Sequence, residues 1–427
     1  MTNAALVPLM TDHYEFTMVN AALADGSADR SCVFEVFARR LPTGRRYGVV
    51  AGIGRLVELL AAYRFDDADV DYLLSAGVVD ERTARWLRAY RFSGDVDCYA
   101  EGELYFPGSP ILTVTGGFAE CVLLETLVLS VLNHDSAIAS AAARMVTAAR
   151  GRPIIEMGSR RTHEHSAIAA ARAAYLAGFS TTSNVAAGRA YAIPTAGTSA
   201  HAFTLLHADE PTAFASQVET MGTDTTLLVD TYDISQGIRN AIAAAGPRLR
   251  AIRIDSGDLD VMAQQSRDLL DSLGANDTKI VVSGDLDEYA IATLAAAPVD
   301  VYGAGTAVVT GSAAPTANLV YKLVEVDGAP VVKRSENKAT VGGRKTAVRR
   351  HKPTGTVTEE VVVSQGVPEP MPGDQALQVP LLRGGEPVEN LPGLKDSRAL
   401  LRQRLISIPW DGLKLSPGDA CVPVVMR

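Results

Sequence analysis

The feature that most constrains this chain is a series of short apolar runs between about residues 134 and 320. Each run is followed by small and polar residues and then by an Ala-rich stretch of helical character. Repeating units of this kind favour a parallel β-sheet, because parallel neighbours need long crossover connections. Seven runs favour a barrel or near-barrel over an open sheet. The interval between the second and third runs leaves room for one short helix, so we predict an irregular barrel. The runs are residues 153–157, 178–181, 192–196, 226–230, 250–254, 279–283 and 299–302.

Composition and the pattern of predicted strands and helices divide the chain into three regions. Residues 1–133 mix short strands and helices, and we predict an N-terminal α+β domain there. Residues 134–320 carry the α/β barrel and form the predicted catalytic domain. Residues 321–427 are richer in β-forming residues, Pro and Gly, and form a C-terminal segment.

Composition excludes several classes of protein. A formal net charge of −9 argues against a nucleic-acid binder, although local basic residues can still line a cleft for anions. The cysteines at 32, 98, 121 and 421 form no C-x-x-C pair, so a reducing cytoplasm fits them better than a zinc ribbon or a disulfide framework. The N-terminus does not read as a secretory signal. The longest apolar stretch, residues 121–132, is short and polar enough to predict a buried helix rather than a membrane span.

Polar residues cluster directly after the apolar runs. In parallel α/β folds, sites are assembled at the carboxyl ends of the strands. We therefore expect an enzyme that handles phosphorylated substrates along this edge. In chain order the clusters read EMGSRRTHEH, STTSN, GTSAH, DTYD, RIDSGD, SGDLDE and YGAGT.

The last two clusters are short glycine turns that suit a phosphate. One contains Ser283 and Gly284, and the other contains Gly303, Gly305 and Thr306. Glycine lets the backbone approach a ligand, and free amides at a following helix N-terminus favour an anion. Either motif alone reads equally as an ordinary tight turn. As a pair at adjacent strand ends, they predict a phosphate monoester held from two sides.

The RIDSGD cluster places charges on one face of a strand. Alternate residues share a face, so Arg253 and Asp255 point the same way. The pair is either a buried ion pair, neutral to stability at best, or a clamp in which Arg253 holds a substrate carboxylate. In the second case, Asp255 and Asp258 could hold ribose hydroxyls or the waters of Mg²⁺.

Two other stretches are strongly basic. Arg160 and Arg161 follow the first strand, where a cationic pair suits a polyphosphate. Residues 342–352, with the sequence GGRKTAVRRHK, are the most basic stretch of the chain. They read either as a solvated loop or hairpin, or as a mobile arm that meets polyphosphate.

Three histidines stand near these clusters. His163 and His165 form an H-x-H pair, but no further His or Cys accompanies them, so we expect them to face solvent or to support neighbouring residues. His201 follows Thr198 at the third strand end. It is either a satisfied core or interface residue, or a general base or phosphoryl acceptor.

Taken in order, these motifs resemble the nicotinate phosphoribosyltransferase family. The series covers residues 11 to 324, and its order and spacing are specific although each short motif alone is weak. The motifs are TDHYEFTM at 11–18, EMGSRR at 156–161, TTSN at 181–184, GTSAH at 197–201, LVDTYD at 228–233, RIDSGDL at 253–259, SGDLDE at 283–288, GAGT at 303–306 and YKLV at 321–324.

The resemblance implies a reaction. The family joins nicotinate to phosphoribosyl pyrophosphate (PRPP), giving nicotinate mononucleotide and pyrophosphate in NAD biosynthesis. It couples this transfer to ATP hydrolysis through a phosphohistidine, which would be His201 here, with Asp255 as a second catalytic residue. The chain would hold no metal of its own. Mg²⁺ would enter with the phosphates of PRPP and ATP, with Asp255 or Asp258 as candidate ligands.

The resemblance also implies binding residues and an architecture. The family fold is an irregular α/β barrel beside a smaller domain built from both chain ends, and the usual form is a homodimer in which residues such as Tyr14 reach across the interface. We thus expect the partners nicotinate, PRPP and ATP, with neither nucleic acid nor membrane, in the cytoplasm. The implied contacts are Tyr14, Thr198 and Arg253 with nicotinate; Ser283, Gly284, Gly303, Gly305 and Thr306 with the 5′-phosphate; and Arg160 and Arg161 in the same pocket.

Three rival interpretations stay open on the sequence. Nicotinamide phosphoribosyltransferase shares the fold and the ATP coupling. Quinolinate phosphoribosyltransferase needs no phosphoryl-accepting histidine, and its substrate has two carboxylates. A catalytically silent, ligand-sensing barrel would keep the pocket without turnover. The sequence also departs from some relatives that carry a cysteine-rich zinc element, which the cysteines here cannot supply.

Overall fold

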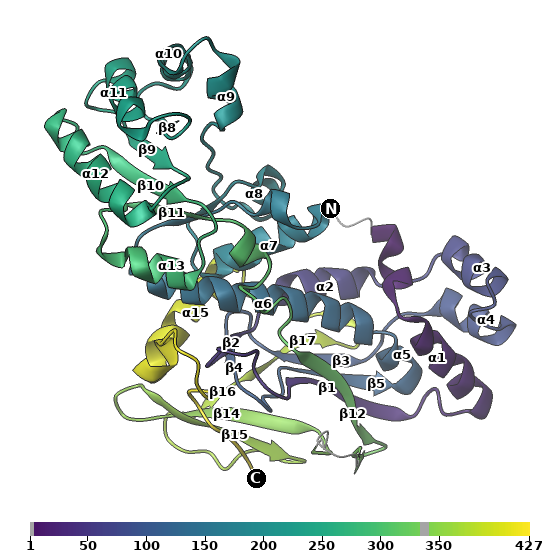
Figure 1. Cartoon of the computed structure of the whole chain (residues 1–427). Coiled ribbons are helices and arrows are strands. Elements are labelled where there is room, and N and C mark those ends of the chain that lie inside the picture. Colours follow the sequence, from purple (N-terminus) through teal and green to yellow (C-terminus); the bar gives the residue numbers. More distant parts are fainter. Residues whose placement is uncertain (1–3, 334–340) are drawn as a thin grey trace. The chain divides into compact units, whose positions relative to one another are not determined.

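The computed structural model describes residues 4–333 and 341–427, and the chain divides into two compact units (Figure 1). One unit consists of residues 141–313, here called the parallel-sheet unit. The other combines residues 1–140 with 314–427 and is here called the two-ended unit. We expected the domain built from both chain ends to be the smaller one. The two-ended unit contains more residues than the parallel-sheet unit, because its C-terminal segment adds a sheet of its own.

The parallel-sheet unit is built on a six-stranded parallel sheet in the order β7–β6–β11–β10–β9–β8, all within fully described residues. The strands are β6 (Ile154–Glu156), β7 (Thr181–Thr182), β8 (Thr226–Leu228), β9 (Ala251–Ile254), β10 (Lys279–Ser283) and β11 (Val301–Ala304). The helices between and after them are η2 (Ser159–Arg161), α7 (Glu164–Ala177), α8 (Val185–Tyr191), α9 (His201–Leu206), α10 (Glu210–Met221), α11 (Ile234–Ala245), α12 (Leu259–Ser272), α13 (Glu288–Thr293), η3 (Leu294–Ala296) and α14 (Thr306–Val309). The predicted alternation of strands and helices is confirmed.

The predicted irregular barrel takes the form of a curled half-barrel. β7 and β8 are the outer strands of the order, so the sheet is open. Six of the seven apolar runs form strands. Residues 192–196 contribute an isolated bridge between Thr182 and Thr195, because α8 fills most of the interval that precedes them.

The register of the sheet brings the polar strand ends together. Ser283 on β10 pairs with Gly303 on β11, and Ala304 on β11 pairs with Glu156 on β6. Parallel strands present all their carboxyl ends at one edge. The fold therefore gathers the sequence clusters at that edge.

The two-ended unit contains antiparallel sheets among its described residues. A seven-stranded sheet has the order β13–β12–β1–β5–β3–β17–β18, and a four-stranded sheet has the order β16–β14–β15–β19. A further short pair joins β2 to β4. The strands are β1 (Ser31–Ala38), β2 (Gly48–Val49), β3 (Asp95–Tyr99), β4 (Leu104–Tyr105), β5 (Leu112–Gly117), β12 (Leu319–Val326), β13 (Ala329–Pro330), β14 (Lys345–His351), β15 (Val357–Ser364), β16 (Gln375–Ala376), β17 (Gln378–Arg383), β18 (Glu386–Pro387) and β19 (Val424–Met426).

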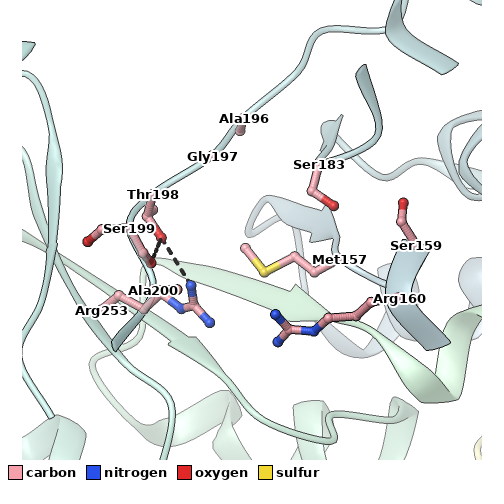
Figure 2. Close-up of a pocket in the computed structure, with 10 residues that line it drawn as sticks. All are labelled: Met157, Ser159, Arg160, Ser183, Ala196, Gly197, Thr198, Ser199, Ala200 and Arg253. Atoms are coloured by element: carbon pink, nitrogen blue, oxygen red, sulfur yellow. Dashed lines mark hydrogen bonds between the residues drawn. The ribbon is translucent and has the colours of Figure 1, made fainter. Parts of the chain in front are cut away.

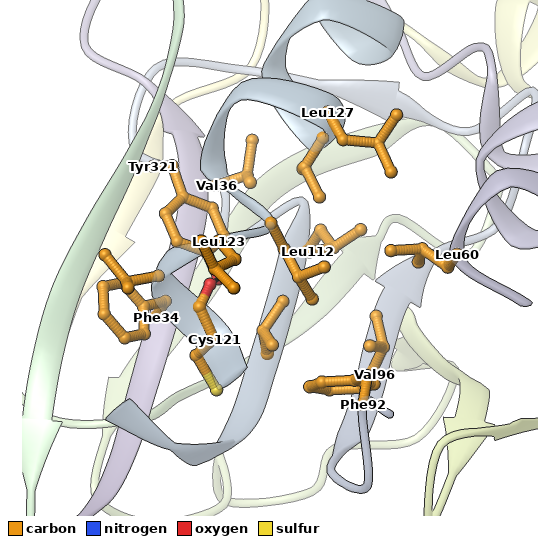
Figure 3. Packing of buried hydrophobic residues seen from close by; sticks show 14 of the residues in the cluster. Phe34, Val36, Leu60, Phe92, Val96, Leu112, Cys121, Leu123, Leu127 and Tyr321 are labelled. Atoms are coloured by element: carbon orange, nitrogen blue, oxygen red, sulfur yellow. Dashed lines mark hydrogen bonds between the residues drawn. The ribbon is translucent and has the colours of Figure 1, made fainter. Parts of the chain in front are cut away.

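Helices from both chain ends accompany these sheets, and apolar side chains fill the core between them (Figure 3). Phe34 of β1 stacks on Tyr321 of β12 with ring centroids 4.9 Å apart. The Tyr321 hydroxyl donates to the carbonyl of Cys121. The helices are η1 (Ala4–Met10), α1 (His13–Asp25), α2 (Ile53–Ala62), α3 (Asp67–Ser75), α4 (Glu81–Ala89), α5 (Phe118–Val122), α6 (Glu125–Ala148), α15 (Leu394–Ser407) and η4 (Trp410–Leu413).

The apolar stretch at residues 121–132 lies in α5 and α6, as the sequence predicted. In the described part of the chain, residues 118–148 form one stretch that is long and apolar enough to cross a membrane. About two thirds of its most apolar window is buried inside the protein, as in the core helix of a folded domain.

The basic segment at residues 342–352 belongs to a hairpin, as one interpretation allowed, but its cations are largely buried rather than solvated or mobile. It forms β14, which pairs with β15 in an antiparallel hairpin. Lys345, Arg349 and Arg350 are buried, and Arg349 is only 1% exposed. Arg349 pairs with Glu103 and Glu360, so the apparent basic patch is neutralised inside the fold.

Candidate active site

Two cavities open at the carboxyl edge of the parallel sheet, and they share Met157, Arg160 and Arg253. The first cavity has a volume of about 260 Å³ and the second about 210 Å³. The first is lined by Met157, Ser159, Arg160, Ser183, residues 196–200 and Arg253. The second is lined by Met157, Arg160, Arg161, Arg253, Asp255, residues 283–285, Gly303, Gly305 and Thr306.

Arg253 is fixed at the boundary of the two cavities. Its Nε donates to Ser283 Oγ at 2.7 Å, its Nη1 to Thr198 Oγ1 at 3.0 Å, and its Nη2 to Asp255 Oδ1 at 3.0 Å. Figure 2 shows its guanidinium facing that of Arg160 across the first cavity, with the Met157 side chain above the gap in this view. A guanidinium has five N–H donors, so two stay unused by the described residues. Arg253 is therefore both an ion-pair partner and a held cation at the cavity wall.

Asp255 is held as a carboxylate beside Arg253. Burial alone would raise the pKa of Asp255, but the hydrogen bond from Ser283 and the charge of Arg253 hold that pKa below its usual value. The Ser283 hydroxyl donates to Asp255 Oδ1 at 2.5 Å and accepts from Arg253. Both bonds to Asp255 use Oδ1, so Oδ2 has no hydrogen-bond partner among the described residues.

The two glycine turns lie at the second cavity, as the sequence predicted. Gly284 has φ = +114°, and a Cβ there would lie 2.7 Å from the carbonyl oxygen of Asp255. A Cβ on Gly303 would lie 2.9 Å from the sulfur of Met157. Gly284 therefore excludes a side chain, whereas a side chain at Gly303 would require Met157 to move, and both residues line the cavity.

His201 stands at the first residue of α9 and is bracketed by two polar groups. Its Nδ1 lies 3.1 Å from Thr231 Oγ1, and its Nε2 lies 3.9 Å from Asp230 Oδ1. The imidazole is 41% exposed, whereas the Asp230 side chain is 1% exposed. Asp230 Oδ2 accepts from the backbone N–H of Asp255, while Oδ1 is buried without a hydrogen-bond partner in the described residues. The imidazole is therefore accessible on one side and faces a buried carboxylate on the other.

The remaining predicted residues lie in different settings. Asp258 is exposed at the N-terminus of α12 and lines neither cavity. His163 and His165 are exposed at the start of α7. Tyr14 belongs to the two-ended unit, on α1, and is 46% exposed. Partial burial and the neighbouring carboxylates of Glu125 and Glu15 raise the pKa of Tyr14.

The oxygen donors of the site decide whether it suits Mg²⁺. Among residues 4–333 and 341–427, no group of three or more His, Cys, Asp or Glu side chains is arranged to hold a metal ion. Mg²⁺ commonly keeps several waters and binds through one or two carboxylates plus substrate phosphates. Asp255 Oδ2, at the second cavity, suits that mode.

Two family models match this chain in succession. The model of the nicotinate phosphoribosyltransferase N-terminal domain matches residues 9–133, and that of the nicotinate phosphoribosyltransferase family matches residues 153–356. The chain belongs to the nicotinate phosphoribosyltransferase family. The second model spans the whole parallel-sheet unit apart from its first residues, including both cavities.

Curated members of the nicotinate phosphoribosyltransferase family resemble the chain along nearly its full length. Nicotinate phosphoribosyltransferase pncB1 of Mycobacterium tuberculosis is 62% identical, over 97% of this chain and 94% of the relative. The Bacillus subtilis nicotinate phosphoribosyltransferase is 40% identical, over 80% and 72% of the two chains. The solved structure of human nicotinic acid phosphoribosyltransferase superposes with a TM-score of 0.86 at 29% identity, over 98% and 97% of the two chains.

Sequence reasoning missed several residues that shape this candidate site. Asp230 and Thr231 were grouped at a strand end, but no role was assigned to them. Met157 was not singled out, although it lines both cavities. Their positions in the sequence could have indicated them, since all three residues end or directly follow an apolar run.

Proposed function

We propose that this chain joins nicotinate to PRPP, forming nicotinate mononucleotide and pyrophosphate, and couples the transfer to ATP hydrolysis through His201. The observation that carries the proposal is the fixed Arg253 guanidinium at the junction of two adjacent cavities. One cavity suits a small aromatic carboxylate and the other a phosphorylated sugar. Membership of the nicotinate phosphoribosyltransferase family supports the same reaction.

Nicotinate is proposed to occupy the first cavity. Its carboxylate would accept from the unused N–H groups of Arg253, with Thr198 beside them. A charge-assisted pair of this kind favours an anionic carboxylate over the neutral amide of nicotinamide. Met157 offers a polarizable thioether to the face of the pyridine ring.

The phosphoribosyl group is proposed to occupy the second cavity. The Ser283 hydroxyl is already committed to Arg253 and Asp255, so the 5′-phosphate would take its contacts from the backbone around Gly284, Gly303 and Gly305 and from Thr306. Arg160 and Arg161 would face the pyrophosphate. Bound Mg²⁺ would neutralise charge on the departing pyrophosphate, with Asp255 Oδ2 toward its waters.

The chain's own contribution to transfer is mainly positioning. Displacement at the anomeric carbon brings the pyridine nitrogen in as pyrophosphate leaves, and both reactants must be held in line. Because Arg253 touches both cavities, it would fix the nicotinate carboxylate relative to the sugar. The C–N bond to the pyridine then forms as the C–O bond to pyrophosphate breaks.

ATP coupling is proposed to act through the imidazole of His201. Asp230 Oδ1 is placed to accept the Nε2 proton after a small movement, which leaves Nδ1 as the nitrogen that attacks the γ-phosphorus. An N–P bond forms, the bond to the β-phosphate oxygen breaks, and ADP leaves. Water later hydrolyses the phosphohistidine and releases phosphate. Thr231 would guide the ring through its contact with Nδ1 in the resting state.

The proposed assembly is a homodimer in which Tyr14 of one copy completes the nicotinate site of the other. The exposed ring of Tyr14 supports this role, since an aromatic face can stack on a pyridine. The cytoplasm is the proposed location, and the free cysteines at 32, 98, 121 and 421 support a reducing compartment.

Product analysis tests the function. Purified protein is incubated with PRPP and Mg²⁺, with nicotinate or nicotinamide, and with or without ATP. We expect nicotinate mononucleotide and pyrophosphate, formed faster with ATP, and far less product from nicotinamide. Product from nicotinamide at an equal rate, or none from either base, would contradict the proposal.

A further inference from the structure

A buried carboxylate connects two of the turns that line the cavities. Glu156 ends β6, is 1% exposed and lines neither cavity itself. Its Oε1 accepts from the backbone N–H of Gly158, and its Oε2 accepts from Thr182 Oγ1 at 2.5 Å. Thr182 ends β7 and is also 1% exposed. One side chain therefore links the turn after β6 to the turn after β7.

A second link closes this connection into a ring. The backbone N–H of Asn184 donates to Thr182 Oγ1 at 3.0 Å, and Asn184 Nδ2 donates to Ser159 Oγ at 2.9 Å. Ser159 directly precedes Arg160 and Arg161. The turn that carries both arginines is thus tied at Gly158 and at Ser159, immediately before the first arginine.

Burial raises the pKa of Glu156, whereas the hydrogen bonds from Thr182 and from the backbone N–H of Gly158 oppose that shift. The Gly158 N–H donates to Glu156 Oε1, and the Thr182 hydroxyl accepts from Asn184 and donates to Glu156 Oε2. Both oxygens of Glu156 therefore accept, and an O···O distance of 2.5 Å is typical of a hydroxyl bound to a carboxylate. Replacing either donor would leave a buried carboxyl oxygen of Glu156 without its hydrogen bond.

The turn at residues 158–161, here called the arginine turn, packs tightly against the loop at residues 303–306, here called the glycine loop. A Cβ on Gly158 would lie 2.1 Å from Val309 Cγ1 of α14 and 2.9 Å from the carbonyl oxygen of Gly305. A shift of this turn would change the spacing between the two arginines and the loop at residues 303–306. Both of these elements line the second cavity.

We propose that Glu156 and Thr182 are positioning residues, which set Arg160 and Arg161 at the spacing from the glycine loop that PRPP requires. The proposal rests on the proposed function and adds the residues that determine the affinity for PRPP. Neither residue lines either cavity. Their effect therefore passes through the arginine turn.

A matched pair of variants at Thr182 tests this role. Thr182→Val is nearly isosteric but removes the donor to Glu156 and the acceptor of Asn184, whereas Thr182→Ser keeps the hydroxyl. We expect Thr182→Val to raise the KM for PRPP by about tenfold or more, with kcat changed by less than about threefold. Thr182→Ser should return that KM to within about twofold of the wild type.

Thr278→Val is the control for a general loss of packing. Thr278, the residue before β10, is also fully buried, and its hydroxyl donates to the carbonyl of Leu249. This variant should lower the melting temperature without changing the KM for PRPP. Equal KM changes in Thr182→Val and Thr278→Val, or a folded Thr182→Val with wild-type KM, would overturn the proposal.

Two further measurements keep the test decisive. If Thr182→Val does not fold, Asn184→Ser keeps an oxygen to cap α8 but cannot reach Ser159, and an unchanged KM for PRPP in that variant would count against the ring. Titration calorimetry with PRPP and Mg²⁺ separates the two proposals. A wild-type protein that binds PRPP without forming nicotinate mononucleotide refutes the function, while the affinities of Thr182→Val and Thr182→Ser still decide the positioning role.

Discussion

Arg253 forms the ion pair of the first interpretation, and the carboxylate clamp of the second stays a prediction. The sequence left open whether it forms a buried ion pair or a clamp for a carboxylate. The structure gives it Asp255 as an ion-pair partner, and also Thr198 and Ser283 as neutral anchors. Anchoring by three partners removes rotamer freedom before any substrate binds, which lowers the entropic cost of recognition.

His201→Asn tests the chemistry of the imidazole. The variant should lose ATP hydrolysis and ATP-dependent phosphoenzyme, because the amide offers no nucleophilic nitrogen. It should keep slow, ATP-independent transfer, because the two cavities do not include His201. Phosphoenzyme is measured with γ-labelled ATP and transfer by chromatography of the products.

The exposed His165 on α7 provides the control. His165→Asn should leave both ATP hydrolysis and transfer unchanged. Persistent phosphoenzyme in His201→Asn would move the phosphoryl acceptor to another residue.

At the scale of elements, the alternation of residues predicted which side chains share one face of a strand. Alternation along β9 put Arg253 and Asp255 on one face, and the 3.0 Å contact between them confirms it. The anchors of Arg253 come from 55 and 30 residues away, at Thr198 and Ser283. Nothing local indicates which distant hydroxyl meets a guanidinium, so these partners needed the tertiary fold.

The hairpin predicted for the basic strand β14 is confirmed, but its expected solvation is wrong for the same reason. A run of cations reads as solvated when its counter-charges are remote in sequence. Glu103 and Glu360 lie 246 and 11 residues from Arg349. Their carboxylates make burial of the guanidinium tolerable, because a buried charge needs a paired partner.

Arg349→Met should destabilise the two-ended unit severely. It leaves Glu103 and Glu360 buried with their shared cation removed, a loss that typically costs about 3–5 kcal/mol. Denaturant unfolding followed by circular dichroism measures the change. Arg88→Met removes an exposed pair with Asp71 and should cost under about 1 kcal/mol. Equal losses in the two variants would refute the role assigned to burial.

Helix α1 carries a pH-dependent contribution to stability at Glu15. Burial raises the pKa of Glu15 to about 8, while hydrogen bonds from Thr126 oppose the shift. The neutral acid is thus favoured in the folded state, whereas the unfolded side chain ionises near pH 4.3. The stability that Glu15 contributes is complete below that pH and declines by up to about 1.4 kcal/mol per pH unit until about pH 8.

Glu15→Gln isolates this effect, since the amide does not titrate. The difference in melting temperature between the wild type and Glu15→Gln should favour the wild type most at pH 5 and shrink toward pH 8. Calorimetry at both values measures it. A difference that is constant with pH would show that Glu15 is ionised in the folded protein.

At the scale of the whole molecule, the residues proposed to bind substrate belong to two units. Both cavities lie in the parallel-sheet unit, while Tyr14 belongs to the two-ended unit. If Tyr14 serves the site of a second copy, variants with separate defects should complement each other.

Co-expression of Tyr14→Ala with His201→Asn tests the shared site. Each variant alone should lack ATP-stimulated transfer. A random mixture should recover about a quarter of the wild-type activity, because half of the dimers are mixed and each has one intact site. No recovery, with mixed dimers verified by affinity tags, would mean that Tyr14 acts within its own chain.

The wall shared by the two cavities has a consequence for inhibition. A single compound carrying a carboxylate and a phosphate could span Met157, Arg160 and Arg253 and compete with both substrates at once. Resistance to such a compound would be hard to acquire at Arg253, since any substitution that expels the inhibitor also releases Thr198, Ser283 and Asp255 from their common partner.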